Sequence, residues 1–249
     1  MQLQTMMIKM VLAWWLFSNL IMAKDYVLLV GVGEFQNSTL FPKFDVQQDI
    51  EKMKNSIGQR LDSNHTIVEL VNEKATKANI LSTLRDIARK VTQNDKVYFY
   101  YTGHGISHND SIIWKYLRKL DRNERGFLVG TSAILPYDFD ENNIRDSIIV
   151  GSKEFAPIIR QIDEKTYESE ILLDACFSSL LARGERLEAD FRGKKDKKYK
   201  NTTIISSTNR TSSGSKGSRM SDILSKCPKN KSFKECIKKS KSSDSFRVK

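Results

Sequence analysis

Residues 96–105, KVYFYYTGHG, combine a continuous apolar run with an abrupt, glycine-flanked end. The run over 96–101 is rich in aromatic residues and is typical of a strand that is buried on both faces of a sheet. It stops at Gly103-His104-Gly105, where the glycines allow a sharp turn and a close approach of the backbone. We therefore expect a buried strand over 96–101 that delivers His104 to the edge of a sheet.

A second segment of the same kind lies at residues 170–178, EILLDACFS. It places Cys176 shortly after a predicted strand over 170–173. In an open parallel sheet, ligands and reactive groups gather at the carboxyl ends of the strands. His104 and Cys176 are therefore expected in one crevice, where an imidazole can accept the thiol proton and the thiolate can act as a nucleophile.

Apolar runs and amphipathic segments alternate along the rest of the chain. Further strands are expected at 26–32, 66–71 and 202–206, and helices at 44–57, 77–91 and 154–162. The stretches 126–129 and 135–138 are expected to form short edge strands and a turn. Residues 106–125 are expected to form a polar insertion. This order predicts an α/β fold with a mostly parallel sheet and helices on both faces.

Composition divides the chain into three parts. Residues 1–23 hold a lone Lys9, an apolar run and a terminal Ala23, which is typical of a cleaved secretory signal peptide; a retained anchor is the alternative. Most of the net charge of +11 lies in residues 211–249, which contain 11 Lys/Arg against 3 Asp/Glu. We expect one domain over 24–210 and a solvated Lys/Ser-rich tail over 211–249, with contact to an anionic surface as the tail's alternative role.

The three cysteines fit an oxidising compartment. In an exported protein, Cys227 and Cys236 are close enough in sequence to form a local disulfide, which leaves Cys176 as an unpaired thiol. The expected location, secreted or periplasmic, follows from the predicted signal peptide over 1–23.

Both strand-end motifs, in this order and in a βα setting, resemble those of caspase-fold cysteine peptidases. The resemblance is to the metacaspase-like and bacterial caspase-like members, and it runs from about residue 26 to residue 207. It implies a caspase-like three-layer sandwich and a Cys–His dyad, with Cys176 as nucleophile and His104 as general base and acid. It also implies that the backbone N–H groups of Gly105 and Cys176 form the oxyanion hole.

The same resemblance carries an expectation about the substrate. Asp174, Asp49 and Thr102 match the positions that line the primary pocket of metacaspase-like members. Two carboxylates favour a bidentate Arg or a Lys, so cleavage after Arg or Lys is expected. The alternatives are a solvent-facing Asp49, with Asp45 in its role, and a turn-forming Asp174.

The loop over 183–200 is rich in Arg and Lys, and self-processing there is a further hypothesis. Three features depart from the family pattern. Ser179 replaces a usual Gly, Phe177 replaces a common His, and the chain is expected to lack a full sixth strand. These departures concern the loops and the pocket rather than the dyad.

The expected partner is a peptide or protein substrate with a basic residue before the cleaved bond. No cofactor, metal site or nucleic-acid partner is expected; calcium dependence stays open, and no oligomeric state is predicted. Two other functions compete with a peptidase. One is a catalytically silent caspase-fold module used for binding or regulation, and the other is a nucleic-acid or envelope binder acting through residues 211–249.

Overall fold

The computed structural model describes residues 23–108, 110–119, 125–176, 181, 199–207, 218–240 and 246–248. The expected signal segment lies outside the described residues, apart from Ala23. So do Phe177, Ser179 and all but the last two residues of the loop over 183–200. Among the described helices, none is long and apolar enough to cross a membrane.

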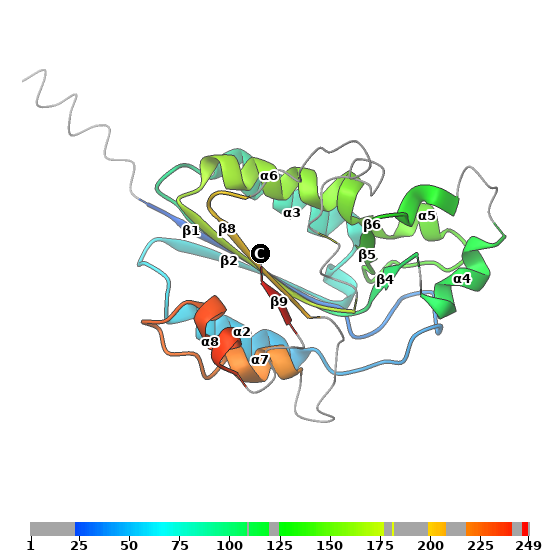
Figure 1. The fold of residues 1–249 in the computed structure, drawn as a ribbon, viewed down its shortest axis with the longest axis horizontal. Helices are drawn as coiled ribbons and strands as arrows, with labels where there is room; N and C mark the ends of the chain where they lie inside the picture. Colours follow the sequence, from blue (N-terminus) through cyan, green and yellow to red (C-terminus); the bar gives the residue numbers. More distant parts are fainter. Residues whose placement is uncertain are drawn as a thin grey trace, which may run out of the picture.

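A six-stranded sheet forms the centre of the protein, in the order β2-β1-β3-β7-β8-β9 (Figure 1). The first five strands in this order pair in parallel, and β9 pairs with β8 in antiparallel orientation. The strands are β1 Asp25–Gly31, β2 His65–Val71, β3 Lys96–Thr102, β7 Glu168–Asp174, β8 Thr202–Ser207 and β9 Phe246–Val248.

Helices cover both faces of this sheet (Figure 1). One face holds α3 (Lys77–Lys90) and α6 (Ala156–Lys165), and the other holds α2 (Gln47–Gly58), α7 (Arg219–Leu224) and α8 (Phe233–Lys239). Along β3, side chains alternate between two cores, so Tyr101 packs toward α3 and α6 while Tyr100 packs toward α2 and α7. Burial on both faces explains why β3 is apolar throughout. The predicted α/β sandwich is confirmed.

A small antiparallel sheet follows the end of β3. It consists of β4 (Gly105–Ser107), β5 (Ser132–Ile134) and β6 (Ile149–Val150), in that order. The remaining described elements are the η1 turn Asn72–Lys74, α4 Ser111–Leu117, the η2 turn Arg125–Leu128, α5 Ile144–Ser147 and the π-helical turn η3 Gly151–Phe155, which leads into α6.

Two expectations for this region were wrong. Residues 126–129 were expected to form an edge strand, but most of them lie in the η2 turn, where Phe127 and Leu128 are buried together. Gly130, at φ 73°, then redirects the chain, and the strand forms at 132–134, just before the expected stretch 135–138. The predicted polar insertion begins instead with the paired and buried strand β4.

The expectation of a solvated tail over 211–249 also needs correction. Helices α7 and α8 pack on the sheet through apolar side chains spaced four residues apart, and β9, a strand of three residues, takes the sixth place in the sheet, where no full strand was expected. Lysines between these positions conceal the amphipathic pattern in the overall composition. The buried side chains are Met220, Leu224, Phe233 and Ile237.

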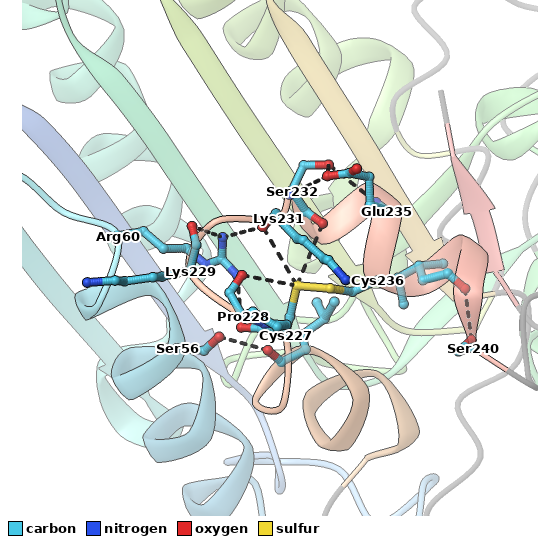
Figure 2. Close-up of a disulfide and its surroundings, with 12 residues drawn as sticks. Ser56, Arg60, Cys227, Pro228, Lys229, Lys231, Ser232, Glu235, Cys236 and Ser240 are labelled. Atoms are coloured by element: carbon cyan, nitrogen blue, oxygen red, sulfur yellow. Dashed lines mark hydrogen bonds between the residues drawn. A yellow bond between two sulfur atoms is a disulfide. The ribbon is translucent and has the colours of Figure 1, made fainter.

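A disulfide joins Cys227, in the loop after α7, to Cys236 in α8, with the sulfur atoms 2.06 Å apart (Figure 2). The guanidinium group of Arg60, just beyond α2, donates hydrogen bonds to backbone carbonyls of this loop, the shortest at 2.6 Å to Lys231 O. Its other acceptors are the carbonyls of Cys227, Pro228 and Lys229. The disulfide-linked segment is therefore held against the end of α2.

Candidate active site

His104 and Cys176 leave two neighbouring strands at the same level. Thr102 and Asp174 are register partners at the carboxyl ends of β3 and β7, and each candidate lies two residues beyond the end of its strand. The Gly103 N–H donates to Asp174 O at 3.4 Å, which keeps the two chains together past the ladder. Both His104 and Cys176 are partly exposed. The structure thus brings together the two strand ends that the sequence singled out.

Gly105 packs directly against the backbone of Cys176. A Cβ at position 105 would overlap the Cys176 carbonyl oxygen and would lie 3.2 Å from the Cβ of Ala175. The same residue begins β4 and pairs with Ile134. Glycine is therefore required here by close backbone approach. The two residues expected to supply oxyanion donors are adjacent in space.

An aromatic cage surrounds the His104 ring. Its centroid lies 4.8 Å from that of Phe41, 4.9 Å from that of Phe44 and 5.8 Å from that of Phe35. The Nε2 atom lies 3.1 Å from the Pro42 carbonyl oxygen. Because a carbonyl only accepts, this contact assigns the hydrogen to Nε2 and leaves the lone pair of the neutral ring on Nδ1. Packing and this hydrogen bond fix the ring.

The backbone of His104 is anchored as well. The buried Tyr101 hydroxyl lies 2.9 Å from both His104 O and Leu135 O, and the Leu135 N–H donates to His104 O at 3.1 Å. Because Tyr101 belongs to β3, the turn that carries the histidine is tied to the central sheet and to the small sheet together.

Two buried carboxylates lie beside this strand end. Asp49 on α2 is 0% exposed, and its Oδ2 accepts from Thr102 Oγ1 at 3.2 Å. Asp174 Oδ2 accepts from the Tyr100 hydroxyl at 3.3 Å. Burial, and then the charges of Asp174 and Asp49, raise the pKa of Tyr100 well above its ordinary value, so the phenol stays protonated.

One of the alternatives for the acidic residues, a solvent-facing Asp49, is wrong. Asp49 is not solvent-facing, because it lies at the buried interface between α2 and the sheet. Asp45 is exposed, and its carboxylate accepts from the Gln47 N–H at 2.8 Å at the start of α2. The structure places Asp49, Thr102 and Asp174 in one cluster and leaves Asp45 outside it.

Sequence reasoning missed three partners of the site. The Pro42 carbonyl is a backbone group and has no residue-type signature. Asp49 Oδ1 accepts from the Ser218 N–H at 2.7 Å and from Ser221 Oγ at 2.6 Å, both in the segment expected to be a tail. A serine N-cap before two apolar residues spaced four apart, Met220 and Leu224, was the available sign of a helix there.

The sequence model of the family described as metacaspase, peptidase C14 domain, matches residues 36–183, more than half of the chain. The chain belongs to this metacaspase family. The matched range contains both strand-end motifs and the three residues of the acidic cluster. Membership makes this protein part of a family of cysteine peptidases, whose substrates are proteins or peptides.

Solved structures show the same fold. The crystal structure of protein GSU0716 from Geobacter sulfurreducens has a TM-score of 0.54 at 16% identity, covering 91% of this chain and 92% of its own. The Drosophila initiator caspase Dronc has a TM-score of 0.51 at 9% identity, covering 86% of this chain and 70% of its own. No curated protein matches the sequence. At these identities, the two likenesses support the caspase fold alone.

Proposed function

We propose that this metacaspase is an active cysteine endopeptidase that cleaves after Arg or Lys through a Cys–His dyad. The proposal rests on the positions of His104 and Cys176, which follow the register-paired ends of β3 and β7 at the same distance. The buried carboxylates of Asp49 and Asp174 lie beside these strand ends. A reactive pair at strand ends supplies the chemistry, and the acidic cluster supplies the specificity.

The proposed reaction begins with transfer of the Cys176 thiol proton to Nδ1 of His104, while the Pro42 carbonyl holds the Nε2 hydrogen. The thiolate attacks the carbonyl carbon of the scissile bond, and the backbone N–H groups of Gly105 and Cys176 stabilise the resulting oxyanion. The imidazolium then protonates the leaving amine as the C–N bond breaks. Water, deprotonated by His104, hydrolyses the thioester and regenerates the thiol.

The acidic cluster supports a basic substrate side chain. The hydroxyls of Thr102 and Tyr100 donate to Asp49 and Asp174, and as neutral donors they orient the carboxylates without cancelling their charge. A guanidinium group matches carboxylate oxygens in a bidentate manner, and an ammonium group matches them as a point charge. An aspartate side chain before the cleaved bond would be repelled by these carboxylates, because both carry negative charge.

Fluorogenic peptides ending in Arg, Lys or Asp test the proposal directly, with wild type and Cys176→Ala side by side. We expect cleavage of the Arg and Lys peptides by wild type only. Cleavage of the Asp peptide alone would contradict the specificity, and equal rates in both proteins would contradict the role of Cys176.

The same pair of proteins tests self-processing. We infer that Arg and Lys residues in the loop over 183–200 are cleavage sites, because this loop follows the nucleophile and carries the preferred residue type. Wild type should yield fragments that Cys176→Ala does not.

We also propose that the protein is secreted or periplasmic. The Cys227–Cys236 disulfide supports this location, because disulfides persist in oxidising environments.

A further inference from the structure

One oxygen of the Asp49 carboxylate is held by a segment far away in the sequence. Its Oδ1 accepts from the Ser218 N–H at 2.7 Å and from the Ser221 hydroxyl at 2.6 Å, and all three residues are 0% exposed. The Ser221 hydroxyl also lies 3.0 Å from the Ser218 carbonyl oxygen. The shorter distance and the charge of the carboxylate favour Asp49 as its acceptor.

These contacts belong to a row of polar contacts between α2 and the C-terminal segment. Lys52 forms an ion pair with Asp222 at 2.6 Å, and the buried Ser56 hydroxyl donates to Leu224 O at 2.8 Å. Arg60 continues the row beyond α2. Its guanidinium donates to the loop after α7 and lies 4.1 Å from the Phe233 ring centroid.

The spacing of the α2 residues in this row is helical. Neighbouring members of the row are three or four residues apart, so they lie along one side of α2 and of the residues that follow it: Asp49, Lys52, Ser56 and Arg60. The row ends at Asp49, whose Oδ2 contacts Thr102 at the carboxyl end of β3. Helix α7 is therefore docked along α2 with its first turn on the acidic cluster.

We propose that α7 is a specificity-determining part of the peptidase and that Ser221 is a positioning residue for Asp49. The inference rests on the proposed cleavage after Arg or Lys. Two donors on Oδ1, from Ser218 and Ser221, fix the rotation of the carboxylate and direct Oδ2 toward the strand ends. Ser221 acts through Asp49 and touches no reacting atom.

Ser221→Ala tests this role, with Ser56→Ala as a matched control. Both changes remove one buried hydroxyl from the interface of α2 and α7, but only Ser221 contacts Asp49. A hydrogen bond to a charged group accounts for roughly tenfold or more in binding, so we expect Ser221→Ala to raise KM for an Arg peptide by about tenfold. Its kcat should stay close to wild type, because the P1 side chain is bound alike before and during reaction.

The double variant Asp49→Asn/Ser221→Ala separates positioning from general stability. If Ser221 acts through Asp49, the Ser221→Ala change should add little to the KM of Asp49→Asn. Ser56→Ala should also lower the melting temperature, while its KM stays within about twofold of wild type.

Equal KM changes in Ser56→Ala and Ser221→Ala, or additive effects with Asp49→Asn, would overturn the positioning role while leaving the proposed function intact. A wild-type protein that cleaves no Arg or Lys peptide would overturn the proposed function and this inference with it.

Discussion

Two glycines of the site have neighbours that lie too close for any side chain at these positions. Gly105 has no room for a Cβ beside the Cys176 carbonyl, and Gly103 has none beside the Tyr101 hydroxyl. The His104 ring is fixed by aromatic neighbours and by the Pro42 carbonyl. Pre-organisation of this kind limits motion of the proposed catalytic groups before substrate arrives.

Replacing Gly105 with Ala should disable catalysis. The added Cβ would overlap the Cys176 carbonyl, so the backbone that carries the proposed oxyanion donors must shift. Loss of one such donor costs about 10²–10³ in rate, and we expect kcat on an Arg peptide to fall by at least that factor.

Gly126→Ala is the control for this change, because a Cβ at position 126 meets nothing within 4 Å. It should retain wild-type kcat, and circular dichroism should show both variants folded. Activity in Gly105→Ala close to that of Gly126→Ala would contradict the proposed oxyanion site.

The elements after β8 complete the fold. Helix α7 brings Ser221 to Asp49, the disulfide ties the loop after α7 to α8, and Phe246 in β9 pairs with Ser207 in β8. Their apolar side chains enter the core between the sheet and α2, while their lysines lie toward the surface. The C-terminal segment is thus part of the domain.

Removal of the disulfide should loosen the segment that carries α7. The bond closes a loop with a sequence separation of 9. By loop-closure entropy, Cys227→Ser/Cys236→Ser should lower the free energy of unfolding by about 2–3 kcal/mol. Urea denaturation of the double variant and wild type, both without reductant, measures the difference.

The same double variant keeps Cys176, so its activity reports on the link between α7 and the acidic cluster. We expect a higher KM for an Arg peptide and a smaller change in kcat. An unchanged KM together with the expected loss of stability would show that the disulfide stabilises the fold without affecting the site.

On the scale of the whole molecule, one buried carboxylate on the central sheet is influenced by groups from the segment after α2 and from α8. Glu170 on β7 is 6% exposed. Burial, and then the neighbouring Glu168, raise its pKa to about 7, although Arg60 and the Phe233 N–H act in the opposite direction. Burial and the charge of Glu170 also raise the pKa of the nearby Tyr98. The folded protein therefore binds a proton at Glu170 more tightly than the unfolded chain does.

This shift predicts that stability falls as pH rises. The contribution of Glu170 is fully present below about pH 4.5, the ordinary value for a glutamate, and is lost as pH passes about 7. The loss amounts to about 3 kcal/mol at most. Glu170→Gln, which cannot ionise, should flatten the decline between pH 5 and pH 8 in urea unfolding experiments. An equally steep decline in the variant would assign the pH dependence to other groups.

Much of the central fold was predictable from local patterns. The strands over 96–101 and 170–173 were found because a strand covered on both faces needs a continuous apolar run, and the observed strands β3 and β7 contain them. The region after β3 was less predictable. The short strands β4, β5 and β6 span only two or three residues each, so pairing partners rather than local sequence decide where they form.

The amino-acid sequence alone determined the order of the main strands and helices as far as β8, the strand-end positions of His104 and Cys176, and the candidate acidic residues. These depend on periodicity and residue type, which act over a few neighbours. Only the tertiary structure decided the burial of Asp49, the Pro42 carbonyl contact and the place of α7. Asp49 and Ser221 are separated by 172 residues, and a backbone carbonyl is the same in every residue type. Such contacts exist only once the sheet has set both segments side by side.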